Sequence, residues 1–297
     1  MRTFLTILAI PLLLGGCAGA GTSGGPSSSN ARSAAPSSAA KYSVATGADK
    51  LVLRLADEGG FVAPGFLLTR TPQFALYGDG RVIVPGPVDA ISPGPLLPNL
   101  RQMHVTPDEI QKILAAADAA GLLGPDASYR ATNIMDASTT VFTTIVAGKV
   151  HITSAYALSE SGATGDSPDA VAQAKLLDFQ GQIQNLAGFL GRPAADDQAY
   201  EPTGMEVFPN VAPPSDGSSP TPQVVTWPLA ADPATGGQPT LVEGTRCFLV
   251  QGTDLATFLA VAKNANALTV WTAPSGRYTV QVRPLYPEES GCSTGGA

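Results

Sequence analysis

The chain has 297 residues, of which 44% are hydrophobic and 14% charged, and its formal net charge is −7 at pH 7. The chain is acidic and has few Lys and Arg residues, so it lacks the clustered positive charge that binds nucleic acids and anionic lipid headgroups. We therefore expect neither as an electrostatic partner. The hydrophobic content is sufficient for the core of one or two domains.

The N-terminal residues are typical of an export signal. Arg2 supplies one positive charge, and an apolar run extends from Phe4 to Leu14. As a helix this run would be roughly 16 Å long, about half of a hydrocarbon core. It therefore predicts a cleaved signal peptide over residues 1–16 rather than a membrane-spanning helix.

The sequence Leu14-Gly15-Gly16-Cys17 resembles the lipobox of bacterial lipoproteins. The resemblance implies that the Cys17 thiol accepts a diacylglyceryl group, that cleavage makes Cys17 the first residue, and that its amine is then acylated. Two or three acyl chains anchor a protein stably, so we expect an exported protein held on the outer face of the cell membrane by lipid alone. The alternative is a general signal peptidase that cuts after Ala18-Gly19-Ala20 and leaves no lipid.

A spacer is predicted after the lipidation site. Residues 18–45 are mostly Gly, Ser, Ala and Pro, which bury too little apolar surface to offset the entropy of ordering them. We therefore predict a lipidated Cys17 and disordered tether over residues 17–48, which would span roughly 30 Å. The tether contains a G-x-S-x-G match at Gly21–Gly25, but it lacks the strand and helix that a nucleophile elbow needs.

Removal of the signal peptide would also remove Arg2. The mature chain would then have 16 basic and 24 acidic residues, a net charge of −8.

Residues 49–195 are predicted to form an N-terminal α+β subdomain. It begins with a strand at Leu51–Leu55. A hairpin over Gln73–Val84 is expected to turn at Asp79-Gly80, because Asp-Gly supports the positive φ angles of a tight primed turn. A loop rich in Pro and Gly continues to about Leu100.

The clearest helix is predicted over Pro107–Ala120. Thr106 suits the N-cap, Pro107 suits the first turn and Glu109 completes a capping box. Gly121 is expected to end the helix. Its apolar positions recur on one face, which we expect to be buried: Ile110, Ile113, Leu114 and Ala117.

A second hairpin and a longer helix follow. The hairpin covers Thr139–Ala155 and is expected to turn at Ala147-Gly148. The helix runs from about Ser167 to Leu190, and its apolar residues recur at intervals of three and four. We expect it to pack on a sheet, with a coiled coil as the alternative.

Residues 196–297 are predicted to form a smaller α+β C-terminal subdomain, or else to continue the preceding domain. The polar, Pro-rich stretch 192–222 is interpreted as a boundary or long loop. Beyond it we expect strands near Val224–Trp227 and Cys247–Gln251, a helix over Asp254–Lys263 capped by Thr253, and a hairpin over Leu268–Val282 that turns at Pro274–Gly276. Hairpins mixed with helices favour an α+β fold, an antiparallel sheet with helices packed on one face.

Cys247 and Cys292 are the two cysteines outside the lipobox. In an exported chain two remaining thiols predict a disulfide. It would close a loop of about 45 residues and contribute roughly 4 kcal/mol in the chain-entropy model. Metal binding is the alternative, but neither cysteine has a Cys or His at ligand spacing.

No catalytic, cofactor-binding or metal-binding motif is apparent in the sequence. His104 falls in the predicted loop before the first capped helix. His151 is expected on the sheet surface, on the face opposite Val150 and Ile152. A hydrolase would need a nucleophile beside one of these histidines, for example Ser154 or Ser159 beside His151, with Asp136 orienting the imidazole.

Acidic doublets and tryptophans receive structural interpretations. Asp57-Glu58, Asp196-Asp197 and Glu288-Glu289 are interpreted as solvated loop charge, because adjacent strand residues point to opposite faces and rarely form an acid–base pair. Trp227 and Trp271 are expected in the core, with stacking on sugars as the alternative.

Two stretches carry a family resemblance. Pro72–Val84, with its Tyr77-Gly78-Asp79-Gly80 sequence, resembles a hairpin of uncharacterised domains in bacterial envelope lipoproteins. Arg283–Glu289, before Cys292, is similar to the tail of exported actinobacterial proteins. The resemblance implies membership of such a family without a function.

Three functions remain open from the sequence. The leading hypothesis is a membrane-anchored envelope module that binds an unknown protein or small ligand, without enzymatic activity or cofactor. The second is a carrier of an apolar ligand such as a glycolipid, which requires a large dry pocket. The third is an envelope hydrolase.

Overall fold

The structure is a computed structural model that describes residues 40–130, 134–161, 167–214, 217, 221–240 and 242–292. The described residues, from Ala40 onward, form one compact unit. Cys17, the signal peptide and the tether up to residue 39 lie outside the described residues. None of the helices in the described part of the chain has both the length and the apolar sequence that a membrane crossing demands.

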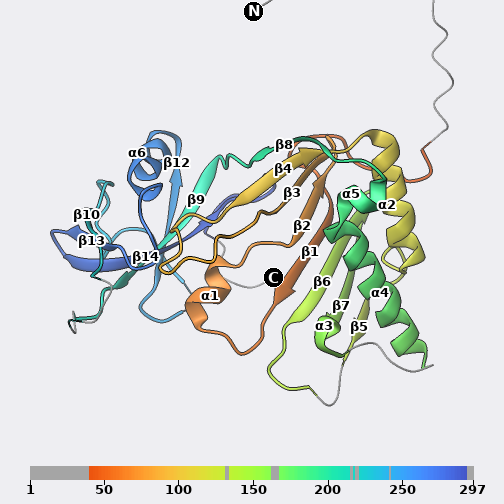
Figure 1. Ribbon diagram of the computed structural model, residues 1–297, viewed down its shortest axis with the longest axis horizontal. Coiled ribbons are helices and arrows are strands. Elements are labelled where there is room, and N and C mark those ends of the chain that lie inside the picture. Colours follow the sequence, from red (N-terminus) through yellow and green to blue (C-terminus); the bar gives the residue numbers. More distant parts are fainter. Residues whose placement is uncertain are drawn as a thin grey trace, which may run out of the picture. The chain divides into compact units, whose positions relative to one another are not determined.

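A large sheet of eight strands organises the first part of this unit (Figure 1). Neighbouring strands are antiparallel except for β5 and β7, which are parallel. Their order across the sheet is β5 (Ala127–Tyr129), β7 (Lys149–Tyr156), β6 (Thr139–Val146), β1 (Leu51–Glu58), β2 (Phe74–Tyr77), β3 (Arg81–Pro85), β4 (Leu100–His104) and β8 (Ala195–Ala199).

A second sheet of six strands follows in the chain. It is also mostly antiparallel, with one parallel pair between β10 and β13. Helix α6 (Gly252–Ala262) packs on this sheet through Leu255 and Phe258. The strand order is β10 (Val224–Thr226), β13 (Val270–Ala273), β14 (Gly276–Pro284), β9 (Gly204–Val211), β12 (Arg246–Gln251) and β11 (Gln238–Pro239).

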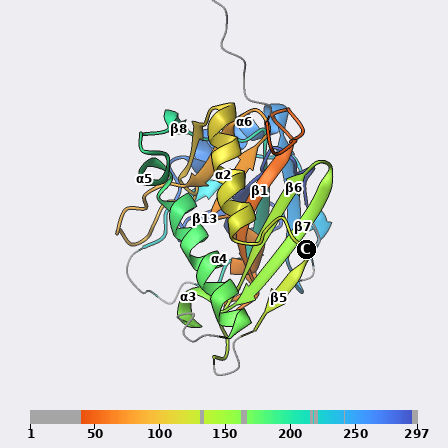
Figure 2. The same cartoon turned by 90° about the vertical axis from the view of Figure 1, so that its right-hand side faces the viewer.

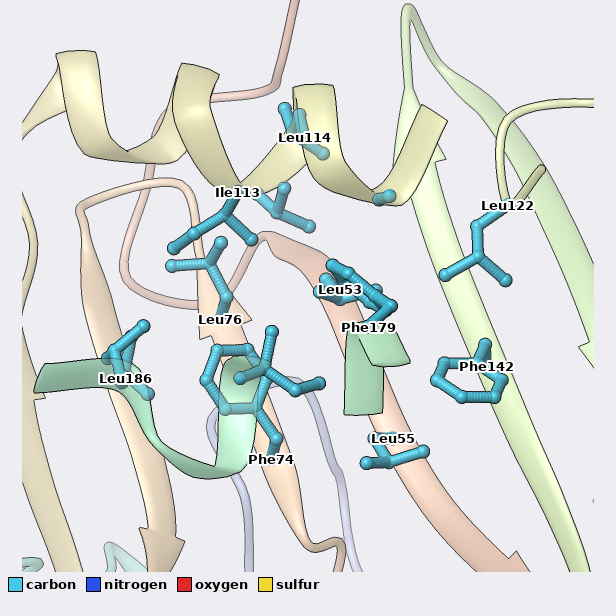
Figure 3. Packing of buried hydrophobic residues seen from close by; sticks show 14 of the residues in the cluster. Leu53, Leu55, Phe74, Leu76, Ile113, Leu114, Leu122, Phe142, Phe179 and Leu186 are labelled. Carbon is cyan, nitrogen blue, oxygen red and sulfur yellow. The ribbon is translucent and has the colours of Figure 1, made fainter. Parts of the chain in front are cut away.

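Two helices cover one face of the large sheet. Helices α2 (Pro107–Ala119) and α4 (Pro168–Gln184) lie across it side by side (Figure 2). Ile113 of α2 and Phe179 of α4 meet Leu53 of β1 in the core between helices and sheet (Figure 3). The remaining helices are short: α1 (Pro64–Thr69), α3 (Leu158–Ser161) and α5 (Leu186–Leu190). The predicted α+β class, with helices packed on one face of a largely antiparallel sheet, is confirmed.

Local signals predicted the capped helix and the hairpins well. In α2 the Thr106 hydroxyl accepts a hydrogen bond from the Glu109 N–H, and the Glu109 carboxylate accepts one from the Thr106 N–H. Both residues of the Ala147-Gly148 turn have positive φ, 50° and 74°, as a primed two-residue turn requires. At the predicted Asp79-Gly80 turn Gly80 has positive φ and Asp79 does not, so that connection is a longer turn rather than a primed one.

Three local predictions were wrong. The stretch 192–222 is not a long loop, because β8 and the central strand β9 lie within it. Strand β9 was not predicted because it contains Glu206 and Pro209, which are unusual in a buried strand, although six of its residues are buried. The N-cap of α6 is Gln251 rather than Thr253, and α4 ends at Gln184, where Asn185 leaves the helical conformation and α5 begins.

Packing begins earlier in the chain than Asp49. Tyr42 is 7% exposed and belongs to the core beside α2. Its backbone N–H donates to Gln111 and its hydroxyl to Asp118, an exposed group of α2. The last residues before β1 are therefore held against the helix layer.

Candidate functional site

The face of the large sheet opposite α2 and α4 is only partly covered. Over β1 to β4, the segment after β14 places Tyr286 against Tyr77 and Ile83. Over β6 and β7, no helix of the described chain covers that face, and Val150 and Ile152 are 49% and 44% exposed. An open groove of about 750 Å³ lies on this uncovered face, at the end where β1 stops.

Strand register builds the floor of this groove from two cross-strand rows. Glu58 of β1 pairs with Thr139 of β6, which pairs with Tyr156 of β7. One row further, Val141 of β6 pairs with Ser154 of β7, and Ser154 pairs with Ser128 of β5. Because directly opposed residues in a sheet share a face, five hydrogen-bonding side chains and one apolar side chain line the floor together.

Two loops that hydrogen-bond to each other form the wall. The Phe61 N–H donates to the Asp136 carbonyl at 3.0 Å, and the Ala137 N–H donates to the Tyr156 hydroxyl at 3.1 Å. Asp136 has a φ of 64°, a conformation that Asp tolerates better than most residues. The wall presents Arg130, Ile134, Met135 and Asp136 to the groove.

Glu58 has the most perturbed environment in the groove. Burial raises the pKa of its carboxyl above the ordinary value, and the positive charge of Arg54 only partly opposes this effect. Shifted carboxyls of this kind often mark functional sites, although structural ion pairs shift them too. Asp57, the preceding residue, points to the helix-covered face, where Gln73 and Thr140 donate hydrogen bonds to its carboxylate. This doublet was wrongly interpreted as solvated loop charge, since β1 extends to its end.

A second groove of about 530 Å³ opens on the helix-covered side of the sheet. It lies where the α4–α5 junction meets β3 and β4, and Val84, Met103, Ile183 and Leu186 give it an apolar lining. Gln73 and Gln184 stand at its rim, joined by a hydrogen bond of 2.6 Å.

The acidic doublet Glu288-Glu289 is also partly buried rather than solvated. Glu288 and Glu289 are each 19% exposed in their side chains. Glu288 accepts hydrogen bonds from Arg54 and from the Tyr77 hydroxyl, while Glu289 pairs with Arg283. Burial and the neighbouring Glu288 charge raise the pKa of Tyr77, so the phenol remains a donor. The tail that carries the sequence resemblance therefore fastens the two sheets together.

Cys247 and Cys292 lie at disulfide distance, with their sulfur atoms 2.04 Å apart, as the cysteine count predicted. A Glu206 carboxylate oxygen lies within 4.8 Å of both sulfurs. Arg283 donates a hydrogen bond to that carboxylate at 3.1 Å. With both thiols in a disulfide and a guanidinium on the carboxylate, this cluster is a structural junction in the state described.

The histidines do not form a catalytic pair with a nucleophile among the described residues. His151 is 7% exposed on the helix-covered face, with Nδ1 2.6 Å from the Gly124 carbonyl oxygen. Its predicted surface position was wrong, because it pairs with the buried Thr144, so Val150 and Ile152 face outward instead. His104 is the last residue of β4 rather than part of a loop. Its Nδ1 lies 3.9 Å from Oδ2 of Asp196, a residue of the exposed Asp196-Asp197 doublet.

Both tryptophans belong to the core of the second sheet, as predicted. Trp271 is fully buried and Trp227 is 7% exposed. Trp271 stacks on Phe258, and Trp227 packs edge-on against it. Neither ring is available as a platform for a ligand.

No known family model, no curated protein and no solved structure matches this chain. The groove on the uncovered face was missed from the sequence because its residues are individually ordinary. The available signal was the Ala147-Gly148 turn: counting outward from it pairs Thr139 with Tyr156 and Val141 with Ser154. The position of Glu58 beside them depends on the β1–β6 pairing, which no local signal predicts.

Proposed function

We propose that this protein is an exported envelope lipoprotein, anchored through lipid on Cys17, and that its folded unit is a binding module. The observation that carries the binding proposal is the groove on the uncovered face, where Glu58, Thr139, Ser154 and Tyr156 converge. Rigid strands position these groups, and a concave site with a few convergent polar side chains is the usual form of a ligand site.

The anchoring part of the proposal is supported by the lipobox resemblance and by the cysteine pair, which suits an oxidising compartment. The mature chain would carry its only membrane attachment at Cys17, with the tether between the lipid and Tyr42. Intact-mass measurement of protein extracted from its own membranes tests this. We expect a chain that begins at Cys17 and carries diacylglyceryl and acyl mass, whereas an unmodified chain beginning at Gly21 would refute it.

Native mass spectrometry of the same preparation tests the binding site. Ser154→Trp fills the groove, and Ile152→Trp is its matched control, because Ile152 lies on the same strand and face but outside the groove. We expect a ligand adduct on the wild type and on Ile152→Trp that Ser154→Trp loses. Equal adduct on all three proteins, or none on the wild type, would count against the groove.

A carrier of an apolar ligand is the second candidate, favoured by the apolar groove beside α5. Ala194→Trp narrows that groove without touching the uncovered face of the sheet. If the co-purified ligand is a lipid that Ala194→Trp loses and Ser154→Trp retains, the carrier function replaces the first proposal.

A further inference from the structure

The groove on the uncovered face combines groups that both donate and accept hydrogen bonds. Ser128, Thr139, Ser154 and Tyr156 each contribute a hydroxyl, and a hydroxyl offers one donor and two acceptor positions. Glu58 adds an acceptor at the end of the first row. A ligand that is complementary to this floor must carry several closely spaced groups that both donate and accept hydrogen bonds.

The charges around the groove nearly balance. Among the described residues that line the groove, Arg130 is the one cation, and Glu58 and Asp136 are the anions. A polyanion would meet a net negative rim on an acidic protein, and a phosphate group would find one guanidinium, that of Arg130, beside two carboxylates. The balance therefore favours an uncharged ligand.

An apolar strip accompanies the polar groups. Val141 lies in the floor between Ser154 and β1, while Ile134 and Met135 line the wall, with Met135 84% exposed. Covering these side chains requires a ligand with a C–H surface beside its hydroxyls. Most of the groove floor lies on the face of β1, β6 and β7, although the edge strand β5 also contributes Ser128. A peptide added as a strand beside β5 would hydrogen-bond to that edge and would not cover the floor on the face.

We propose that the groove binds a short neutral oligosaccharide, whose hydroxyls contact the two cross-strand rows and whose C–H faces cover Val141 and Met135. The volume of about 750 Å³ lies in the range of sites that enclose a drug-sized ligand. This inference rests on the proposed function, since it names the ligand class of the same groove.

A glycan array probed with the full-length protein in detergent, followed by calorimetry, tests the ligand class. The array holds neutral oligosaccharides of two to six units, matched uronic acid and amino-sugar oligomers, and acidic and basic peptides. We expect binding to neutral members only. Ser154→Trp and Glu58→Leu should each weaken it at least tenfold, Glu58→Gln about threefold because its amide oxygen still accepts, and Ile152→Trp less than twofold.

Circular dichroism and melting temperature establish whether each variant is folded, and Glu58→Leu provides a second test if Ser154→Trp is not. Absence of binding to any neutral oligosaccharide, or binding that all variants retain, overturns the saccharide inference. If the adduct of the native protein disappears in Ser154→Trp but has the mass of a peptide or lipid, the inference fails while the proposed binding function stands. If the adduct persists in Ser154→Trp, both fail.

Discussion

Arg283 Nη1 lies 3.1 Å from Glu206 Oε2 at the junction of the two sheets, and Glu206 is only 2% exposed. Although burial alone would lower the pKa of Arg283, its hydrogen bonds and charge interactions with Glu289 and Glu206 raise it. The guanidinium also donates to the Arg70 carbonyl. Arg283 thus pairs with two carboxylates, of which Glu289 also lies 3.5 Å from Arg54, and these ion pairs hold the C-terminal tail in place.

Removing that cation is expected to be costly. Arg283→Met preserves most of the side-chain volume but leaves Glu206 and Glu289 without their shared partner, which we expect to lower the free energy of unfolding by about 3–5 kcal/mol. Urea unfolding measures the change, with the exposed Arg277→Met of β14 as the control. A loss below about 1 kcal/mol would show that the cluster contributes little.

The Cys247–Cys292 pair ties the end of the tail to β12. Its 45-residue separation predicts a stabilisation of roughly 4 kcal/mol from restriction of the unfolded chain. The Cys247→Ser/Cys292→Ser double variant should therefore unfold at lower urea concentration, and a reducing agent should shift the wild type to the same midpoint. A wild type whose midpoint is insensitive to reduction would contradict this expectation.

The capping box of α2 is expected to make stability depend on pH. Although burial opposes it, the hydrogen bonds from the Thr106 backbone and Arg192 lower the pKa of Glu109 in the folded state. A carboxyl with a lowered folded-state pKa stabilises fully above its unfolded value, 4.5, and loses this contribution as the pH falls through the folded value. Between pH 5 and pH 3 the wild type should lose about 1 kcal/mol more than Glu109→Gln, as measured by unfolding at each pH. Parallel curves for the two proteins would refute the assignment.

The contribution of Glu58 to the free energy of unfolding should depend on pH in the opposite sense to that of Glu109. Burial raises the pKa of its carboxyl, so the unfolded chain ionises first and this residue costs stability as the pH rises from the unfolded through the folded value. Glu58→Gln is therefore expected to raise the melting temperature slightly at pH 7, with the gain vanishing at low pH. Such a stability cost is common at ligand sites. A lower melting temperature for Glu58→Gln at pH 7 would indicate a structural role instead.

Local chemistry explains what the sequence predicted. The Thr106–Glu109 box and the Ala147-Gly148 turn need only neighbouring residues, so α2 and the β6–β7 hairpin were predicted nearly to the residue. Strand β9 was missed because a charged residue, Glu206, is not expected in a buried strand. Its charge is compensated by Arg283, which is distant in the sequence. The same holds for the groove, since Glu58 and Ser154 come together only through long-range pairing of β1, β6 and β7.

Photocrosslinking in intact cells tests the central claim that the groove is where the anchored protein binds its ligand. A benzophenone amino acid replaces Tyr156 inside the groove or Val150, which is exposed on the same strand and face but outside it. After irradiation, the intact mass of the purified protein reports any adduct. We expect a defined added mass at position 156 and none at position 150. Equal adducts at both positions, or none at either, would contradict it.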